Sequence, residues 1–241
     1  MDYLDVSLPT PEENLALDEA LLDEAEEATR PREVLRLWEC TSPVVVLGSG
    51  CRFSDDVCDP ACRADAVPIL RRASGGGTVL LGPGCLNFCV VLPYERCAAL
   101  ASIDGAFAFV LSHVRDALAR TGVIVEHQGI SDLVYQGRKV SGSGQRRRRR
   151  NVLVHGTLLY AFDVELLEKY LPMPAPQRRP PYRRDRSHRD FVGNLPASVE
   201  SLRAELRATW TASGPRSTWP DNRVRNLVKE KYTSHAWLHR R

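Results

Sequence analysis

Two arginines, a serine and three consecutive glycines stand together at residues 71–77 (RRASGGG), directly after an apolar run. Consecutive glycines let backbone N–H groups turn toward one point and let a ligand approach closely, because no side chain intervenes. A guanidinium group binds a phosphate or a carboxylate through two parallel hydrogen bonds. Strict alternation along a strand places Arg72 on the same face as Ser74. The segment predicts an anion-binding loop, and taken alone it is also compatible with a glycine-rich strand connection that binds nothing.

Two further groups follow in the second half of the chain. In SDLVYQGRKVSGSGQ (131–145), Lys139 lies between a strand-like run and a run of small residues. A lysine held there supplies a point charge for a phosphoryl or acyl oxygen, although an isolated strand lysine can equally face solvent. In VHGTLLY (154–160), His155 is either a base or a core histidine that orders the turn, and the second interpretation is favoured.

Together these groups resemble the lipoate–protein ligase A family. RRASGGGTV, GRKVSGSG and HGTLL occur in the family's order, and NLALDEALL (14–22) is similar to its first helix. The likeness covers roughly residues 10–170. The wider superfamily includes octanoyltransferases, lipoyl amidotransferases and biotin–protein ligases, but the biotin-branch signatures are absent here. The resemblance implies a catalytic domain of the biotin/lipoate-ligase type.

The resemblance also implies roles for individual residues. Lys139 would be catalytic, and Asp132 with Lys139 would contact the nucleotide. The acyl chain and the adenylate phosphate would be bound by Arg72, Ser74, Gly75, Gly76, Gly77, Ser141, Gly142, His155, Gly156 and Thr157. ATP and Mg²⁺ would enter as co-substrate, with no tightly bound cofactor. The acceptor would be the lysine amine of a lipoyl carrier domain or of a protein like the glycine-cleavage H protein, and the acid would be lipoate or octanoate.

The sequence departs from the family in three places. Leu81 to Cys85 replace the family's H-D-x-G-N, and Val154 replaces the first histidine of HHGTLL. Single-chain ligases carry an accessory domain after the catalytic unit. Here we expect a catalytic domain over residues 1–196 and a short basic helical extension over 197–241, packed on it. The ligase interpretation therefore predicts either a separate accessory subunit or a compact tail.

An ATP-independent octanoyl or lipoyl transferase is the alternative. Some such enzymes use a cysteine nucleophile just before the strand that matches DLVYQ, and residues 123–131 contain none. Cys85 follows a GPG turn and is the more exposed candidate, whereas Cys89 lies in a strand and resembles a buried hydrophobe. Lys139 serves either chemistry and does not discriminate between them.

Composition sets further bounds. The seven cysteines and the absence of a signal peptide or a long apolar span predict a cytoplasmic protein with reduced thiols and no membrane segment. Cys58 and Cys62 lack the further ligands of a metal site, so no metal site is expected.

The charge is unevenly distributed along the chain. Residues 1–137 carry 10 Lys/Arg against 21 Asp/Glu, and the remainder carries 23 Lys/Arg against 9 Asp/Glu. For the arginine run 146–150 we favour docking of an acidic carrier domain over a solvated rim. A non-catalytic basic protein that binds nucleic acid is the weakest alternative.

Periodicity predicts an α+β fold of mixed, mostly antiparallel sheets flanked by helices. Thr10, Pro11 and Glu13 mark the start of a first helix through a capping box, and Asp104 is expected to cap a later one. Residues 78–81 and 87–93 are expected to form a hairpin around GPG. The expected helices span 11–28, 55–66, 104–122, 164–171, 199–213 and 224–232; the expected strands span 35–39, 44–48, 67–72, 123–127, 132–136, 138–144 and 152–162. Residues 172–196 are expected to form a wrapping loop.

Overall fold

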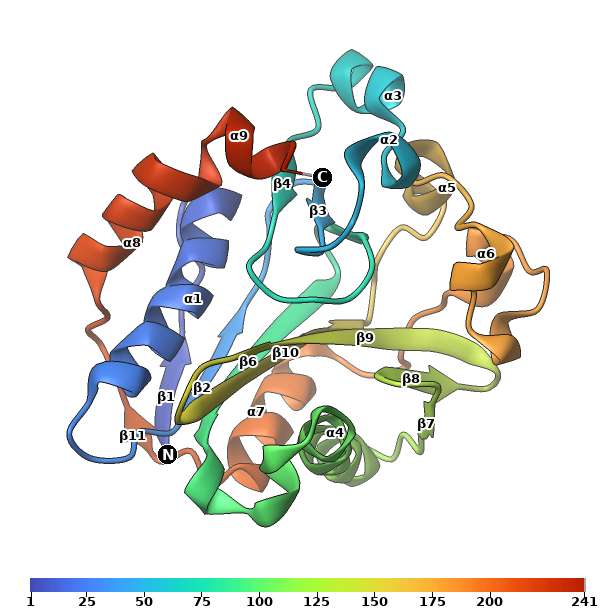
Figure 1. Ribbon diagram of the computed structural model, residues 1–241. Helices are drawn as coiled ribbons and strands as arrows, with labels where there is room; N and C mark the ends of the chain where they lie inside the picture. The colour runs from blue at the N-terminus through green and yellow to red at the C-terminus, as the bar shows by residue number, and fades with distance from the viewer. Residues whose placement is uncertain (241) are drawn as a thin grey trace.

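Eight strands form one sheet through the middle of the molecule, as seen in a computed structural model that describes residues 1–240 (Figure 1). In spatial order they are β11 (Gly214–Pro215), β1 (Asp2–Asp5), β2 (Val34–Trp38), β6 (Cys85–Pro93), β10 (Asn151–Leu159), β9 (Arg138–Arg147), β8 (Asp132–Tyr135) and β7 (Glu126–Gln128). The pairs β11–β1 and β1–β2 are parallel, and the other neighbouring pairs are antiparallel. The predicted α+β class with a mostly antiparallel sheet is confirmed.

Three short strands form a second sheet, in the order β4 (Ile69–Arg71), β3 (Val44–Leu47) and β5 (Val79–Leu81). The expected hairpin between 78–81 and 87–93 is wrong, because β5 pairs with β3 whereas β6 pairs with β2 and β10. Gly84 has a φ of +80°, and a Cβ there would lie 2.2 Å from the carbonyl carbon of Ala161. The turn therefore presses against the end of β10 and carries the chain from the small sheet to the large one.

The large sheet is covered on both faces. The three long helices are α1 (Pro11–Glu27), α4 (Ile103–Arg120) and α7 (Val199–Thr209). Alternation along β2 places Val34 and Trp38 in the core shared with α1 and the small sheet, and places Leu35 and Leu37 in the core shared with α4 and α7. In Figure 1, α1 lies on one side of the sheet, and α4 and α7 lie together on the other.

Side-chain caps begin the two longest helices. Thr10 Oγ1 accepts from the N–H of Glu13 (3.2 Å), and Glu13 Oε2 accepts from the N–H of Thr10 (3.0 Å), so the predicted capping box is confirmed. The expected cap of α4 at Asp104 is wrong. Ser102 is the N-cap, with extended backbone and with Oγ accepting from the N–H of Gly105 (2.9 Å), and this leaves Asp104 inside the first turn.

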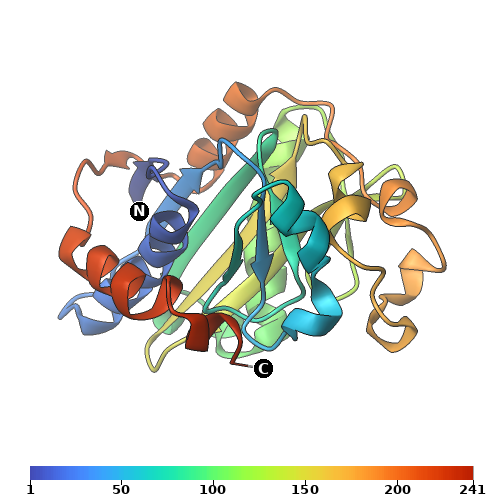
Figure 2. The same cartoon turned by 90° about the horizontal axis from the view of Figure 1, so that it is seen from above.

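Short helices and turns complete the chain. They are α2 (Phe53–Asp56), α3 (Asp59–Ala64), α5 (Leu166–Tyr170), α6 (His188–Phe191), α8 (Asp221–Leu227), a π-helical turn (Val228–Tyr232), α9 (His235–Leu238) and the 3₁₀ turns Tyr94–Arg96, Ala98–Ala101, Pro176–Arg178 and Pro181–Arg183. The C-terminal helices run beside α1 (Figure 2). Between residues 1 and 240, no helix has the length and apolarity needed to cross a membrane.

Candidate active site

The glycine loop, residues Ser74–Gly77, connects β4 to β5 and closes around the guanidinium group of Arg72. Arg72 donates from Nη2 to the carbonyl oxygens of Gly75 and Gly77 (both 2.8 Å) and from Nε to Oγ of Ser74 (2.9 Å). The shared face predicted for Arg72 and Ser74 is therefore confirmed. The N–H of Gly75 donates to the carbonyl oxygen of Gln145 (3.2 Å), so this glycine N–H is already engaged within the protein.

Arg72 brings a buried positive charge to this loop. Its side chain is 7% exposed, and burial lowers its pKa to about 10, which leaves the guanidinium charged at neutral pH. Among the described residues, the guanidinium group donates to carbonyl and hydroxyl oxygens and to no carboxylate. A buried cation without a neighbouring anion favours an anionic ligand.

A buried polar chain holds the loop from behind. Oγ of Ser74 lies 2.6 Å from Nε2 of His155, and Nδ1 of His155 lies 3.1 Å from Oδ2 of Asp18. Oδ1 of Asp18 accepts from Nη1 of Arg36 at 2.5 Å. Burial by itself raises the pKa of the Asp18 carboxyl, but the Arg36 charge and the hydrogen bond from His155 outweigh it, so the pKa is lowered. Asp18 is therefore an anion that fixes the ring of His155, as the favoured interpretation of His155 requires.

Lys139 and Asp132 come together across the β8–β9 hairpin. Their Nζ and Oδ1 atoms are 2.7 Å apart, and Oδ2 of Asp132 accepts from the hydroxyl of Tyr182 (2.7 Å). Burial and the Asp132 charge raise the pKa of Tyr182, so its phenol stays a donor. A Cβ on Gly142 would lie 2.9 Å from both Cε and Nζ of Lys139. The absence of a side chain at Gly142 thus leaves room for the Lys139 side chain.

Two connected cavities meet at Lys139. An inner pocket of about 140 Å³ has apolar walls that include Leu15, Val46, Leu81 and Phe88. An outer cleft of about 930 Å³ runs under the arginine- and proline-rich segment 172–183. Lys139, Asp132 and Gly142 line both, as do Gly76 and Gly77. The arrangement suits a ligand with an apolar tail in the pocket and a polar head in the cleft.

Unpartnered polar atoms gather on these walls. Among the residues described, the buried atoms without a hydrogen-bond partner include Trp38 Nε1, Thr78 Oγ1 and Ser143 Oγ at the inner pocket, and Ser141 Oγ at the outer cleft. An unsatisfied buried polar group costs roughly 1–3 kcal/mol, so each is a natural partner for a polar ligand atom.

The structure brings most residues of the predicted site to the cavity walls. Those that line them are Arg72, Gly76, Gly77, Asp132, Lys139, Ser141, Gly142, His155, Gly156 and Thr157. Ser74 borders a smaller cavity behind the loop, and Gly75 borders none of the three. These two residues hold the loop in place and lie outside the cavity walls.

Sequence reasoning missed three contributors. Asp18 lies four residues after the buried Asn14 on α1. This spacing places both polar residues on one face of the helix, and the sequence could have indicated it. Arg36 is fully buried in an otherwise apolar strand, which marks it for a partner. Tyr182 comes from segment 172–196, whose sequence gave no sign that it would reach Asp132.

The expectation that Cys85 is exposed is wrong. Cys85 and Cys89 are both fully buried in β6, and burial raises the pKa of each thiol. Neither is positioned to form a nucleophilic thiolate. The thiol at the site is Cys51, which lines the outer cleft and donates from Sγ to the carbonyl oxygen of Gly76 (3.4 Å).

The arginine run 146–150 covers the end of β9 and the turn to β10, and most of its side chains contact the protein itself. Arg148 donates twice to Oδ1 of Asp23 (2.9 and 2.6 Å), and Arg147 donates to the carbonyl oxygens of Leu100 and Ala101. Arg150 donates to main-chain oxygens at the end of α1. The favoured docking of an acidic carrier on this run is not supported, because most of these groups are already engaged.

Most of the chain is similar to known proteins. Residues 10–214 match the model of the lipoyl protein ligase A/B catalytic domain. A lipoate-protein ligase A of Aeropyrum pernix is 31% identical over 85% of this chain and 72% of its own length. The corresponding ligase of Mycoplasma pneumoniae is 33% identical over 66% of this chain and 45% of its own length. Octanoyltransferase LipM of Carboxydothermus hydrogenoformans is 26% identical over 95% of this chain and 94% of its own.

Solved structures share the fold. A chain of the bi-partite lipoate protein ligase from Thermoplasma acidophilum, studied with its E2 lipoyl domain, superposes with a TM-score of 0.82 at 22% identity, covering 99% of this chain and 96% of that one. A lipoate-protein ligase A bound with ATP gives 0.82 at 21% identity, covering 99% of both. The family match, the Aeropyrum relative and the shared fold agree with the order of the motifs. The chain therefore belongs to the lipoyl protein ligase A/B catalytic-domain family and is a lipoate–protein ligase or a related acyltransferase.

Proposed function

We propose that this protein attaches lipoate or octanoate to a lysine of a lipoyl carrier domain through an acyl-adenylate made from MgATP. The observation that carries the proposal is the position of Lys139 where the apolar inner pocket opens into the polar outer cleft. An acyl chain in the pocket and a nucleotide in the cleft would bring the carboxyl group and the α-phosphate to this lysine. The ATP-bound relative and the ligase studied with its lipoyl domain have the same fold.

The chemistry has two steps. In the first, a carboxylate oxygen of the acid attacks the α-phosphorus, and pyrophosphate leaves. In the second, the carrier lysine attacks the acyl carbonyl, AMP leaves, and the amine loses a proton. Negative charge develops near the α-phosphate in the first step and on the carbonyl oxygen in the second. The ammonium group of Lys139 stabilises both, and Asp132 holds it in place through the 2.7 Å ion pair.

Transfer of an acyl group between carriers without ATP is the second candidate. Its support is the near end-to-end match to an octanoyltransferase. This route needs either direct transfer or an acyl-enzyme. Cys85 and Cys89 are too deeply buried to carry the acyl group, so Cys51 at the outer cleft is the residue to test.

Mass spectrometry of a purified lipoyl domain separates the two functions. The domain, or a protein of the glycine-cleavage H type, is incubated with this protein and octanoate or lipoate, with and without MgATP. A mass gain that requires MgATP supports the ligase. No gain from the free acid, together with a gain from an acylated carrier donor, supports the transferase, and Cys51→Ser then tests the thiol. A gain with MgATP that requires a second added protein would identify an accessory subunit.

A further inference from the structure

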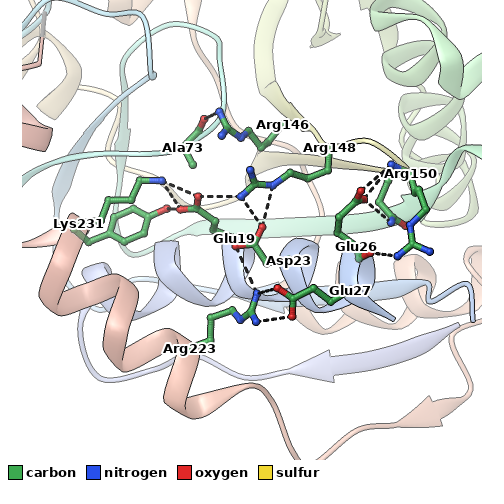
Figure 3. A network of polar contacts seen from close by, with 12 residues as sticks. Glu19, Asp23, Glu26, Glu27, Ala73, Arg146, Arg148, Arg150, Arg223 and Lys231 are labelled. Atoms are coloured by element: carbon green, nitrogen blue, oxygen red, sulfur yellow. Dashed lines mark hydrogen bonds and ion pairs between the residues drawn. The ribbon is translucent and has the colours of Figure 1, made fainter. Parts of the chain in front are cut away.

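The C-terminal segment, residues 216–240, is bound along the acidic side of α1. Arg216 forms two hydrogen bonds to Glu24 (both 2.8 Å), and Arg223 forms two to Glu27 (2.8 and 2.6 Å). Figure 3 shows the pair of Arg223 and Glu27 beside the contacts of Arg148 with Asp23 on the same helix. α1 is therefore held between the C-terminal segment and the β9–β10 turn.

The most buried of these contacts lies behind the glycine loop. Glu19 is 5% exposed and accepts from Nζ of Lys231 (2.7 and 2.8 Å) and from the hydroxyl of Tyr232 (2.8 Å) (Figure 3). Tyr232 borders the same small cavity as Ala73 and Ser74. The segment thus packs against the residues that lead into the loop.

A second contact joins the end of the segment to β4. Nε1 of Trp237 donates to the main-chain oxygen of Arg71 (2.8 Å), and the Arg71 guanidinium donates to the main-chain oxygen of Leu238 (2.9 and 2.6 Å). Arg71 is fully buried. Strand β4 and helix α9 are therefore connected by hydrogen bonds in both directions, at a place only partly exposed to solvent.

Arg71 also contacts the backbone that supports the glycine loop. Its Nη1 also donates to the carbonyl oxygens of Gly48 (3.0 Å) and Cys51 (2.7 Å). A Cβ on Gly48 would lie 2.0 Å from the carbonyl oxygen of Gly76, and Sγ of Cys51 donates to that same oxygen. Arg71 thus holds the backbone at Gly48 and Cys51, and these two residues contact the carbonyl oxygen of Gly76.

We propose that the C-terminal segment is a positioning element for the glycine loop, and that Trp237 acts as a positioning residue through Arg71. Without the indole N–H, the main-chain oxygen of Arg71 in β4 loses a hydrogen-bond donor, and the backbone at Gly48 and Cys51, to which the Arg71 side chain donates, becomes less constrained. The loop then samples conformations that bind ligand less well. The effect on ligand affinity rests on the proposed function, whereas the effect on loop order does not.

Trp237→Phe tests the proposal, with Trp219→Phe as the matched control. Both changes remove an indole N–H from the same segment, but Nε1 of Trp219 has no hydrogen-bond partner among the described residues. Hydrogen exchange of the peptide containing residues 73–78 measures the order of the loop without any ligand. Calorimetry with a non-hydrolysable octanoyl-adenylate analogue measures affinity. Thermal unfolding shows whether both variants stay folded.

Trp237→Phe should speed exchange in the 73–78 peptide and weaken binding of the analogue about three- to ten-fold, the range for one lost intramolecular hydrogen bond. Trp219→Phe should match the wild type in both measurements. Equal exchange and equal affinity in the two variants would overturn the proposal. If the wild type fails to bind the analogue, the adenylate proposal fails while the exchange result still decides the positioning role.

Discussion

Oγ of Ser74 and Nε2 of His155 lie 2.6 Å apart, although 81 residues separate them in the chain. Asp18 accepts from Nδ1 of His155, so Nε2 is left to accept the proton of the Ser74 hydroxyl. Through this contact the central strand β10 is connected to the glycine loop. The loop therefore depends on a buried ion pair that lies deeper in the protein.

Replacing Asp18 should be costly, because Arg36 would keep a buried charge without its partner. Asp18→Asn should lower the free energy of unfolding by about 3–5 kcal/mol, as measured by urea denaturation. Asp185→Asn is the control, since that carboxylate is fully exposed in its pair with Arg179. The double variant Asp18→Asn/Arg36→Met should recover much of the loss. If the double variant were no more stable than Asp18→Asn, this account of the ion pair would be contradicted.

The same carboxyl predicts a pH dependence of stability. The pKa of Asp18 is lowered from its ordinary value of 3.8, so the folded protein binds this proton more weakly than the unfolded chain does. The stabilisation is complete above the ordinary pKa and is lost as the pH falls through the lowered one. In urea titrations from about pH 6 down to about pH 2, the stability difference between wild type and Asp18→Asn should therefore shrink at the acid end. If the stability difference stayed constant over this pH range, the loss in Asp18→Asn would come from packing and not from the carboxylate charge.

Lys139→Ala should reduce turnover about 10²–10³-fold, the scale for removing one donor that stabilises transition-state charge. Lys169→Ala provides the control, because Lys169 also pairs with an aspartate, Asp65, but lies away from both cavities. The rate of carrier acylation is the measurement, with thermal unfolding to confirm the fold. Turnover within a factor of two of wild type in Lys139→Ala would remove this lysine from the mechanism.

Gly142→Ala should displace Lys139 without removing it. The added methyl group would lie 2.9 Å from Nζ, so the lysine must move away from Asp132. We expect a loss of turnover of roughly ten-fold, less than that of Lys139→Ala, because the charge stays in the cleft. Gly214→Ala is the control, as its nearest contact is an ordinary 3.8 Å. Identical rates for the two alanine variants would show that the space beside Lys139 is unimportant.

Substitutions in the arginine run 146–150 should change the stability of the protein but not its recognition of the carrier. Arg148→Ala removes the ion pair with Asp23 and should cost up to about 1 kcal/mol in urea denaturation. Its Michaelis constant for the carrier should stay at the wild-type value. Arg149→Ala, at an exposed position of the same turn, should change neither quantity. A rise of several-fold in that constant for either variant would restore the docking role of the run.

The family and the mixed fold could be predicted from the sequence alone, and most of the residues expected at the site line the two cavities. Local signals were sufficient wherever the physical cause is local. The capping box of Thr10 and Glu13 depends on four consecutive residues, and alternation is enough to place Arg72 and Ser74 on one face. The glycines beside Lys139 were informative because backbone space is needed at that point whatever the rest of the chain does.

Contacts between residues far apart in the chain could not be predicted in this way. Nothing near Cys85 indicates that its turn crosses between sheets and buries the thiol, because that depends on the contact of Gly84 with Ala161. The charge of the run 146–150 favoured docking of an acidic carrier, yet Asp23 of α1 pairs with Arg148 and Glu26 of α1 accepts from the main-chain N–H of Arg150. Burial and pairing are set by the partners that the fold brings into contact, and those partners lie up to 213 residues away, as with Tyr232 and Glu19.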